Sequence, residues 1–277
     1  MTTVQNLTAG KTALLSDNAL EAYRRDGAAL LPGFFTDWLP LLEAGVARNL
    51  AEPSPLATDH RVGAGGGRFF EDYCSWQRLE EYRRFIEESP AAALAGQLMG
   101  AKAVQIFHEH LLIKEPGTTK TTPWHHDLPY YCVGGDQVVS LWTALDPVPA
   151  RVCPRFLAGS HRWGKLYYPR RFDDGVNYDF VGDGYETVPE IDEEAETILS
   201  WDLQPGDSIA FHFLTLHAAP GNAAATRRRG FSTRWLGDDA HFVQRPGKTS
   251  PPFPDIGLEK GERLREDWFP VVWRAGS

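Results

Sequence analysis

The chain has 277 residues, 42% of them hydrophobic, which is enough to bury a full core within one domain. Its formal net charge of -9 at pH 7 excludes a general basic field that would draw the protein onto nucleic acid or an anionic membrane. No apolar run of 18 residues and no secretory signal pattern is present, so we expect a cytoplasmic protein that does not enter a membrane. Three scattered cysteines, Cys74, Cys132 and Cys153, indicate a reducing compartment and argue against a disulfide framework or a thiolate zinc site.

The first hundred residues carry helix signals. Ser16 can cap a helix over 17–26, and a second helix is expected over 37–50. Another helical region is predicted over 79–99. Between the second and third of these, 52–68 contains two prolines and a run of glycines, a composition that favours an irregular, flexible loop that would form a mouth or lid.

From residue 104 onward the hydrophobic period changes from that of a helix to that of a strand. Four strands are predicted, over 104–113, 137–144, 208–213 and 231–236. Helices followed by strands indicate an α+β chain with a mainly β core. Because no glycine-rich phosphate loop and no regular β-α alternation occurs, a doubly wound sheet is disfavoured, and a double-sheet jelly roll fits better.

We expect a single domain over residues 1–277. It would consist of a helical flank (about 16–100), a jelly-roll core (about 104–240) and a C-terminal packing segment (241–277). The prolines and aromatic residues of that last segment predict that it packs on the core. The acidic stretch 173–196 is predicted to be a solvated insertion.

The most informative segment is TPWHHDLPYY at 122–131. In an extended strand, side chains two residues apart point to the same face, so His125 and Asp127 can offer an imidazole and a carboxylate to one ion while His126 faces away. By itself this spacing does not require a metal, because His125 can also be an ordinary surface or core histidine. A non-haem iron site of the facial type needs a second histidine and leaves three coordination positions open. The candidate is His217, at the far end of a later strand.

A candidate anchor for an organic cosubstrate follows His217. 2-Oxoglutarate chelates iron through one carboxylate and its keto oxygen, which leaves a distal carboxylate for a bidentate basic partner. Arg228 is the candidate, because strand alternation places Arg227 and Arg229 together on the opposite face. The competing interpretation is that the three arginines form a solvated charge cluster.

Taken together, these segments resemble the phytanoyl-CoA dioxygenase family of 2-oxoglutarate oxygenases. The resemblance covers roughly residues 68–238. It rests on several motifs in order: Ile113-Lys-Glu-Pro-Gly117, Trp124-His-His-Asp-Leu-Pro-Tyr130, Leu141-Trp-Thr-Ala-Leu145, Ala158-Gly-Ser-His-Arg162, Pro205-Gly-Asp207, and His217 with Asn222.

The resemblance implies a double-stranded β-helix (jelly roll, cupin-like) with N-terminal flanking helices. It implies iron bound by His125, Asp127 and His217, and 2-oxoglutarate anchored by Arg228. His126 departs from the family pattern, in which glutamine is more frequent at this position. His110 and Trp142 stand at positions similar to those that line the 2-oxoglutarate pocket in this family. Lys114 is expected on the same strand face as His110. Ordinary barrel packing is the alternative for His110 and Trp142.

In function, the resemblance implies an Fe(II)- and 2-oxoglutarate-dependent dioxygenase. Such an enzyme uses O2 to hydroxylate an unactivated C–H of a small organic molecule and releases succinate and CO2. Related halogenases lack the carboxylate ligand, so Asp127 favours hydroxylation, desaturation or cyclisation. Two alternatives stay open: a cupin-like iron enzyme that does not use 2-oxoglutarate, and a catalytically silent binding protein on the same scaffold. The sequence indicates neither the substrate nor the oligomeric state.

Several side chains near these motifs allow two interpretations. Arg170 and Arg171 can meet an anionic substrate or form an exposed pair. His161 is expected to close a turn. Six aromatic residues can either form a substrate mouth or pack in the core: Phe69, Phe70, Tyr73, Trp76, Tyr130 and Tyr131.

Overall fold

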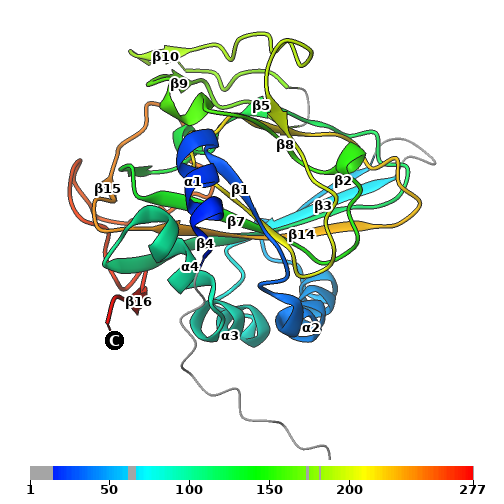
Figure 1. The fold of residues 1–277 in the computed structure, drawn as a ribbon. Coiled ribbons are helices and arrows are strands. Elements are labelled where there is room, and N and C mark those ends of the chain that lie inside the picture. The colour runs from blue at the N-terminus through cyan, green and yellow to red at the C-terminus, as the bar shows by residue number, and fades with distance from the viewer. Residues whose placement is uncertain (1–14, 62–66, 173–174, 181, 277) are drawn as a thin grey trace, which may run out of the picture.

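A computed structural model describes residues 15–61, 67–172, 175–180 and 182–276. Its central feature is a pair of β-sheets that face each other as a double-stranded β-helix (Figure 1). In the larger sheet the strands are ordered β1-β12-β7-β14-β4-β3-β2, with β16 also on β4. In the smaller sheet the order is β11-β8-β13-β5. The larger sheet contains β1 (Ala28–Leu31), β2 (Thr58–Arg61), β3 (Arg68–Tyr73), β4 (Ala103–Lys114), β7 (Val138–Ala144), β12 (Ser208–Phe211), β14 (Arg228–Leu236) and β16 (Val271–Arg274).

The remaining strands are short. The smaller sheet contains β5 (Thr122–His125), β8 (Arg155–Leu157), β11 (Ile198–Leu199) and β13 (His217–Ala219). Two further pairs are β6 (Val133–Gly134) with β15 (His241–Phe242), and β9 (Leu166–Tyr167) with β10 (Tyr185–Glu186). Single 3-10 turns span Thr36–Trp38, Leu128–Tyr130, Ala150–Val152 and Ser160–Arg162.

The helices lie in the N-terminal part, as predicted. They are α1 (Asp17–Asp26), α2 (Leu39–Ala51), α3 (Glu80–Glu88) and α4 (Ala91–Met99). Ser16 caps α1 by accepting a hydrogen bond from the backbone N–H of Ala19. The helical region predicted over 79–99 is two helices, because Pro90 lacks a backbone N–H and disfavours helical geometry at the residue before it.

Helices α2, α3 and α4 cover one face of the larger sheet, and the smaller sheet covers the other (Figure 1). Phe231 of β14 packs on the helix side, where its ring centroid lies 4.5 Å from that of Tyr82 and 5.5 Å from that of Phe85. Side chains alternate along a strand, so Arg228 and Ser232 of the same strand point the other way. The larger sheet therefore has an apolar face toward the helices and a polar face toward the smaller sheet.

The four predicted strands are confirmed as β4, β7, β12 and β14, with shifts of a few residues at their ends. The prediction of an irregular loop over 52–68 is wrong for Thr58–Arg61, which forms β2 and pairs with β3. Pairing with a neighbouring strand satisfies the backbone of this segment, and composition does not reveal that pairing. Most of the glycine run (Gly63, Gly65 and Gly66) lies outside the described residues.

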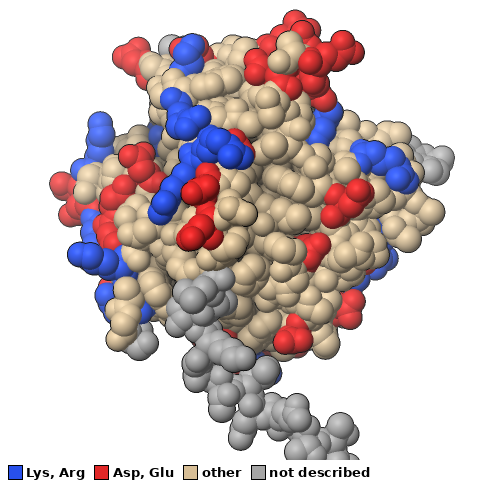
Figure 2. All heavy atoms as spheres, viewed as in Figure 1, with Lys and Arg blue, Asp and Glu red and all other residues tan. Residues whose placement is uncertain are grey.

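The two segments predicted outside the core behave as expected. In the C-terminal segment, Trp273 of β16 pairs with Val104 of β4, and Phe269 is fully buried. In the described part of 173–196, acidic side chains are mostly exposed and gather at the top of the face shown in Figure 2, although Val188 is buried. Among the described residues, no helix has the length and apolar character needed to cross a bilayer.

Candidate metal centre and active site

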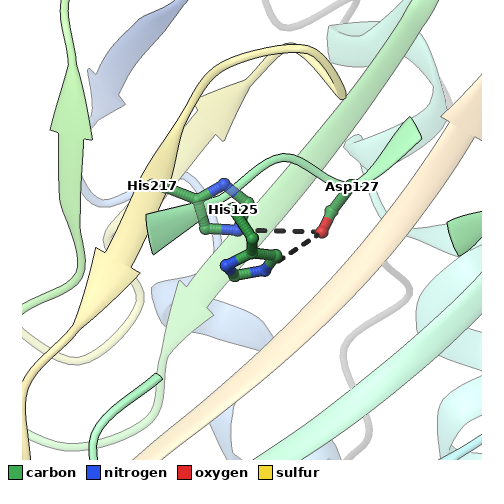
Figure 3. Close-up of side chains that lie close together, drawn as sticks. All are labelled: His125, Asp127 and His217. Atoms are coloured by element: carbon green, nitrogen blue, oxygen red, sulfur yellow. Dashed lines mark ion pairs between the residues drawn. The ribbon is translucent and has the colours of Figure 1, made fainter. Parts of the chain in front are cut away.

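Three predicted ligands come together between the two sheets (Figure 3). The Nε2 atoms of His125 and His217 each lie 3.7 Å from Oδ1 of Asp127. All three donor atoms are within 4.8 Å of one another, so a single ion can contact all of them. Two imidazoles and one carboxylate are the donor set of facial non-haem iron sites, and the residues present fit such an ion.

The two histidines lie at the ends of two paired strands, β5 and β13. His125 is the last residue of β5 and His217 the first of β13, and they are directly opposite in register. Each Nδ1 donates a hydrogen bond to the carbonyl two residues earlier, at 2.8 Å to Pro123 and 2.9 Å to Thr215. Because Nδ1 carries the proton, Nε2 keeps a free lone pair for a metal. Burial and the neighbouring His217 lower the pKa of His125 to about 3, which favours the neutral, metal-binding form.

Asp127 reaches the site in a way that strand alternation does not predict. It follows the end of β5 and has helical backbone angles (φ -74°, ψ -37°), just before the 3-10 turn Leu128–Tyr130. Its backbone N–H donates to the carbonyl of Phe213 at 2.8 Å, which fixes the turn. The prediction that a continuous strand carries His125 and Asp127 is therefore wrong, although both side chains do point to one place.

His217 also differs from its predicted position. It was expected at the far end of the strand over 208–213, but β12 ends at Phe211 and belongs to the larger sheet. His217 begins β13 in the smaller sheet after a turn over 212–216. The chain crosses between sheets here, which a sequence period cannot show.

A buried arginine that the sequence analysis did not identify contacts the carboxylate ligand. Nε of Arg234 lies 3.6 Å from Oδ2 of Asp127 and donates to the Tyr131 hydroxyl at 2.5 Å. The Ser140 hydroxyl also donates to Oδ2, at 3.4 Å. Burial favours the protonated acid, but Arg234 and the two histidines hold the pKa of Asp127 below its ordinary value. Oδ1 thus faces the two imidazoles, where it could contact an ion, and Oδ2 faces Arg234.

A cavity of about 320 Å³ extends from the three ligands along the polar face of the larger sheet. At one end of it Arg228 and Lys114 lie directly opposite in register, on β14 and β4. Nζ of Lys114 donates to the carbonyls of Lys120 and Pro220 at 2.8 and 3.1 Å. The Arg228 guanidinium donates to the carbonyls of Val152 and Pro220.

No carboxylate within the described residues forms an ion pair with Arg228 or Lys114. Burial lowers the pKa of Arg228 to about 10 and that of Lys114 well below its ordinary value. Buried cations are costly unless an anion compensates them. This end of the cavity therefore fits a ligand carboxylate, such as the distal group of 2-oxoglutarate. Arg227 and Arg229 point outward, as predicted, and form ion pairs with Glu115 and Asp146.

Trp142 and His110 both line the cavity. A methyl group at Gly230 would come within 2.2 Å of the Trp142 indole, so the ring lies directly over this glycine. Nε2 of His110 lies 3.3 Å from Glu71, whose other oxygen is 3.1 Å from Nε2 of His60. Against the effect of burial, these two imidazoles lower the pKa of Glu71 to about 2. Sequence analysis missed Glu71 and His60, which belong to the hairpin β2–β3.

The aromatic candidates divide into two groups. Tyr73, Tyr130 and Tyr131 line the cavity together with Arg170 and Arg171. Phe69, Phe70 and Trp76 are buried outside the lining, so core packing is the correct interpretation for them.

Two predicted histidine positions are confirmed. His126 faces away from the ligands, and its Nε2 accepts a hydrogen bond from the backbone of Tyr167 at 2.9 Å. His161 lies in the 3-10 turn Ser160–Arg162. A further histidine, His108, is buried and also lines the cavity.

The fold and the donor set define a class. A double-stranded β-helix that brings two histidines and one carboxylate to a cavity with buried cations is typical of mononuclear non-haem iron oxygenases. Within that class, residues 23–230 match the family model "Phytanoyl-CoA dioxygenase (PhyH)". The chain belongs to this family.

Curated relatives and solved structures agree with this assignment. The chain is 29% identical to human peroxisomal phytanoyl-CoA dioxygenase over 184 residues, 60% of this chain and 52% of that protein. A probable phytanoyl-CoA dioxygenase of Caenorhabditis elegans is 30% identical over 153 residues, 52% and 46% of the two chains. The match thus spans about half the length of these relatives.

Two solved structures extend the comparison. The epimerase SnoN from nogalamycin biosynthesis, in complex with Fe3+, alpha ketoglutarate and nogalamycin RO, has a TM-score of 0.72 at 25% identity and covers 93% of this chain and 98% of its own. EctD from S. alaskensis with 2-oxoglutarate and 5-hydroxyectoine has a TM-score of 0.63 at 19% identity, with coverage of 91% and 86%. The second likeness concerns the fold alone.

Proposed function

We propose that this protein is an Fe(II)- and 2-oxoglutarate-dependent dioxygenase that hydroxylates an unactivated C–H of a small organic molecule. The observation that carries the proposal is the buried pair Arg228 and Lys114, which has no carboxylate partner in the described chain and lies in the same cavity as the three ligands. A cupin-like iron enzyme without 2-oxoglutarate does not need this pair. A silent binding protein does not need the ligand set.

The roles of the side chains follow from their surroundings. His125 and His217 are neutral donors with fixed tautomers, and Asp127 supplies one negative oxygen. Arg228 binds and orients the distal carboxylate of 2-oxoglutarate, with Trp142 and His110 as walls of the same cavity. Bound iron and 2-oxoglutarate supply the activation of O2, with release of succinate and CO2. The protein contributes ligation, orientation and exclusion of water.

A small organic substrate is supported by the ligands of the structural relatives, nogalamycin RO in SnoN and 5-hydroxyectoine in EctD. Nucleic acid is not proposed as a partner, since the net charge is -9. The three free cysteines support a cytoplasmic location. We also propose that residues 1–277 form one domain.

The test is an anaerobic titration of the purified apoprotein with Fe(II) and then 2-oxoglutarate, followed by the visible charge-transfer band of the chelate. Arg228→Ala should raise the Kd for 2-oxoglutarate by about 10- to 100-fold, because a hydrogen bond to a charged group contributes roughly 1.5–3 kcal/mol. Arg227→Ala is the matched control, since that arginine pairs with Glu115 at the surface.

Each failure of this titration has a distinct meaning. If iron binds and no band forms, the 2-oxoglutarate assignment falls and the cupin-like enzyme becomes the better explanation. If Fe(II) does not bind stoichiometrically, the silent binding protein becomes the better explanation.

A further inference from the structure

We propose that a second cavity, outside the iron site, binds an apolar, ring-containing body of the substrate. This inference rests on the proposed function and names the substrate class. The cavity, called the outer pocket below, has a volume of about 1100 Å³. Its lining is built from two segments, Tyr178–Phe180 and Phe242–Ile256, together with Tyr73, Cys132 and Arg171.

The outer pocket adjoins the iron cavity. Four residues line both: Tyr73, Arg171, Tyr178 and Ser250. The Ser250 hydroxyl lies 3.4 Å from that of Tyr73, so the two side chains meet at this junction. The backbone N–H of Ser250 donates to the carbonyl of Tyr130 at 2.8 Å, which fixes the outer segment to the turn that follows Asp127. A molecule in the outer pocket would therefore lie next to the cavity that holds the candidate metal ligands.

The iron cavity is much the smaller of the two, at about 320 Å³ against about 1100 Å³ for the outer pocket. A 2-oxoglutarate held by Arg228 would occupy part of this smaller cavity. A large substrate would therefore place its reacting part there and extend its body into the outer pocket.

The lining of the outer pocket favours an uncharged body. It consists largely of aromatic, aliphatic and proline side chains: Tyr178, Phe180, Phe242, Val243, Pro252, Phe253, Pro254 and Ile256. Arg245 also lines it, but its guanidinium donates to the carbonyls of Leu128, Tyr131 and Val133.

The other charged groups of the outer pocket do not select an ion. Lys248 and Asp179 have opposite charges and are exposed at its edge. Arg171 is also exposed, at the junction with the iron cavity.

The aromatic side chains of the outer pocket favour a ligand that contains rings. Aromatic walls bind planar rings through stacked and edge contacts.

The test uses 1-N-phenylnaphthylamine, a neutral three-ring fluorophore whose emission rises in apolar surroundings. Full-length protein is loaded anaerobically with Fe(II) and 2-oxoglutarate and titrated with this probe. We expect saturable binding of the probe while the charge-transfer band of the chelate persists. Displacement of the band would place the probe in the iron cavity and overturn the proposal.

Two variants address the outer pocket independently. Phe180→Asp places a charge in the apolar lining, and Thr249→Trp fills the space. Each should weaken probe binding at least tenfold. The matched control is Val176→Asp, which makes the same charge change at a side chain that is 51% exposed and outside both linings. If every variant that folds binds the probe as tightly as the wild type, the proposal is wrong.

The link to the substrate needs a second readout. Compounds from a small-molecule library that stimulate succinate formation should displace the probe from the loaded protein. Stimulating compounds that leave the probe bound would show that the substrate does not use the outer pocket. Failure of the proposed function has a different signature, because the chelate band would be absent in the wild type whether or not the probe binds.

Discussion

Arg234 lies outside the candidate ligand set but contacts one of its members, Asp127. Its side chain is buried beside Oδ2 of Asp127, and it also binds the Tyr131 hydroxyl. A carboxylate with one oxygen held in this way offers the other oxygen alone to an ion. A bound iron ion would then be held by one oxygen of Asp127 and by His125 and His217, which would leave room for 2-oxoglutarate and O2.

We predict that Arg234→Gln weakens Fe(II) binding by about 10- to 100-fold, the usual effect of removing a partner that orients a metal ligand. Ser140→Ala should have a smaller effect, because its hydroxyl contacts the same oxygen at the longer distance of 3.4 Å. The measurement is anaerobic titration of the apoprotein with Fe(II). Arg229→Gln serves as the control, since Arg229 lies on the opposite strand face. Equal affinities for Arg234→Gln and the wild type would contradict this role.

At the same scale, the sequence predicts some site residues and not others. His125, Asp127, His217 and Arg228 are found because they stand in ordered motifs of a recognisable family. Arg234 carries only a weak signal, six residues beyond Arg228 on the same strand face.

Glu71 and His60 carry no signal in the sequence. They enter the cavity only because β2 and β3 extend the larger sheet. Their role depends on pairing between distant segments, which local patterns do not encode.

Among the elements, the antiparallel pairing of β7 with β14 positions the wall of the proposed cosubstrate pocket. Trp142 of β7 lies over Gly230 of β14, and a Cβ atom there would approach the indole to 2.2 Å. Such a distance is far below van der Waals contact, so the indole or the strand must move. Glycine at this point lets the ring lie flat between the strand and the cavity.

We predict that Gly230→Ala displaces the Trp142 ring into the cavity and raises the Kd for 2-oxoglutarate by about tenfold or more, while Fe(II) binding changes little. The measurement is the same anaerobic titration of the chelate band. A double variant with Trp142→Phe should recover part of the lost affinity, because the smaller ring leaves space for the new methyl group. If Gly230→Ala binds 2-oxoglutarate normally, Trp142 is not a wall of its pocket.

The strands of the larger sheet were easier to predict than those of the smaller one. β4, β7 and β14 have 12, 7 and 9 residues and show a clear alternation or apolar run. β8, β11 and β13 have only two or three residues. A segment this short has no measurable period, and it becomes a strand only when neighbours supply its hydrogen bonds. The candidate metal ligands His125 and His217 lie on the sheet that periodicity does not detect.

For the molecule as a whole, two buried acids, Asp72 and Glu109, interrupt the otherwise apolar face of the larger sheet that packs against the helices. Asp72 accepts hydrogen bonds from Asn49 and Ser54, and Glu109 accepts one from the backbone of Ser75 at 2.5 Å. Burial raises the pKa of Glu109 from its ordinary value of 4.5 to about 8. An acid buried in this way ties global stability to pH.

We predict that Glu109→Gln stabilises the protein at high pH only. Between pH 4.5 and 8 the unfolded chain has released the proton of Glu109 while the folded protein still holds it, so wild-type stability falls as pH rises through this range. Glutamine has the shape of the neutral acid and no proton to lose. The variant should match the wild type at pH 4 and exceed it at pH 8 and above by up to about 5 kcal/mol, at roughly 1.4 kcal/mol for each pKa unit.

The measurement for Glu109→Gln is the free energy of unfolding from urea titrations of the metal-free protein at pH 4, 6, 8 and 9. Titration of the metal ligands affects both proteins equally and cancels in the difference. Glu194→Gln is the control, because this side chain is exposed and should give no pH-dependent difference. A difference that stays constant from pH 4 to 9 would mean that Glu109 is ionised in the folded protein, and its buried charge would then need a partner other than the Ser75 backbone.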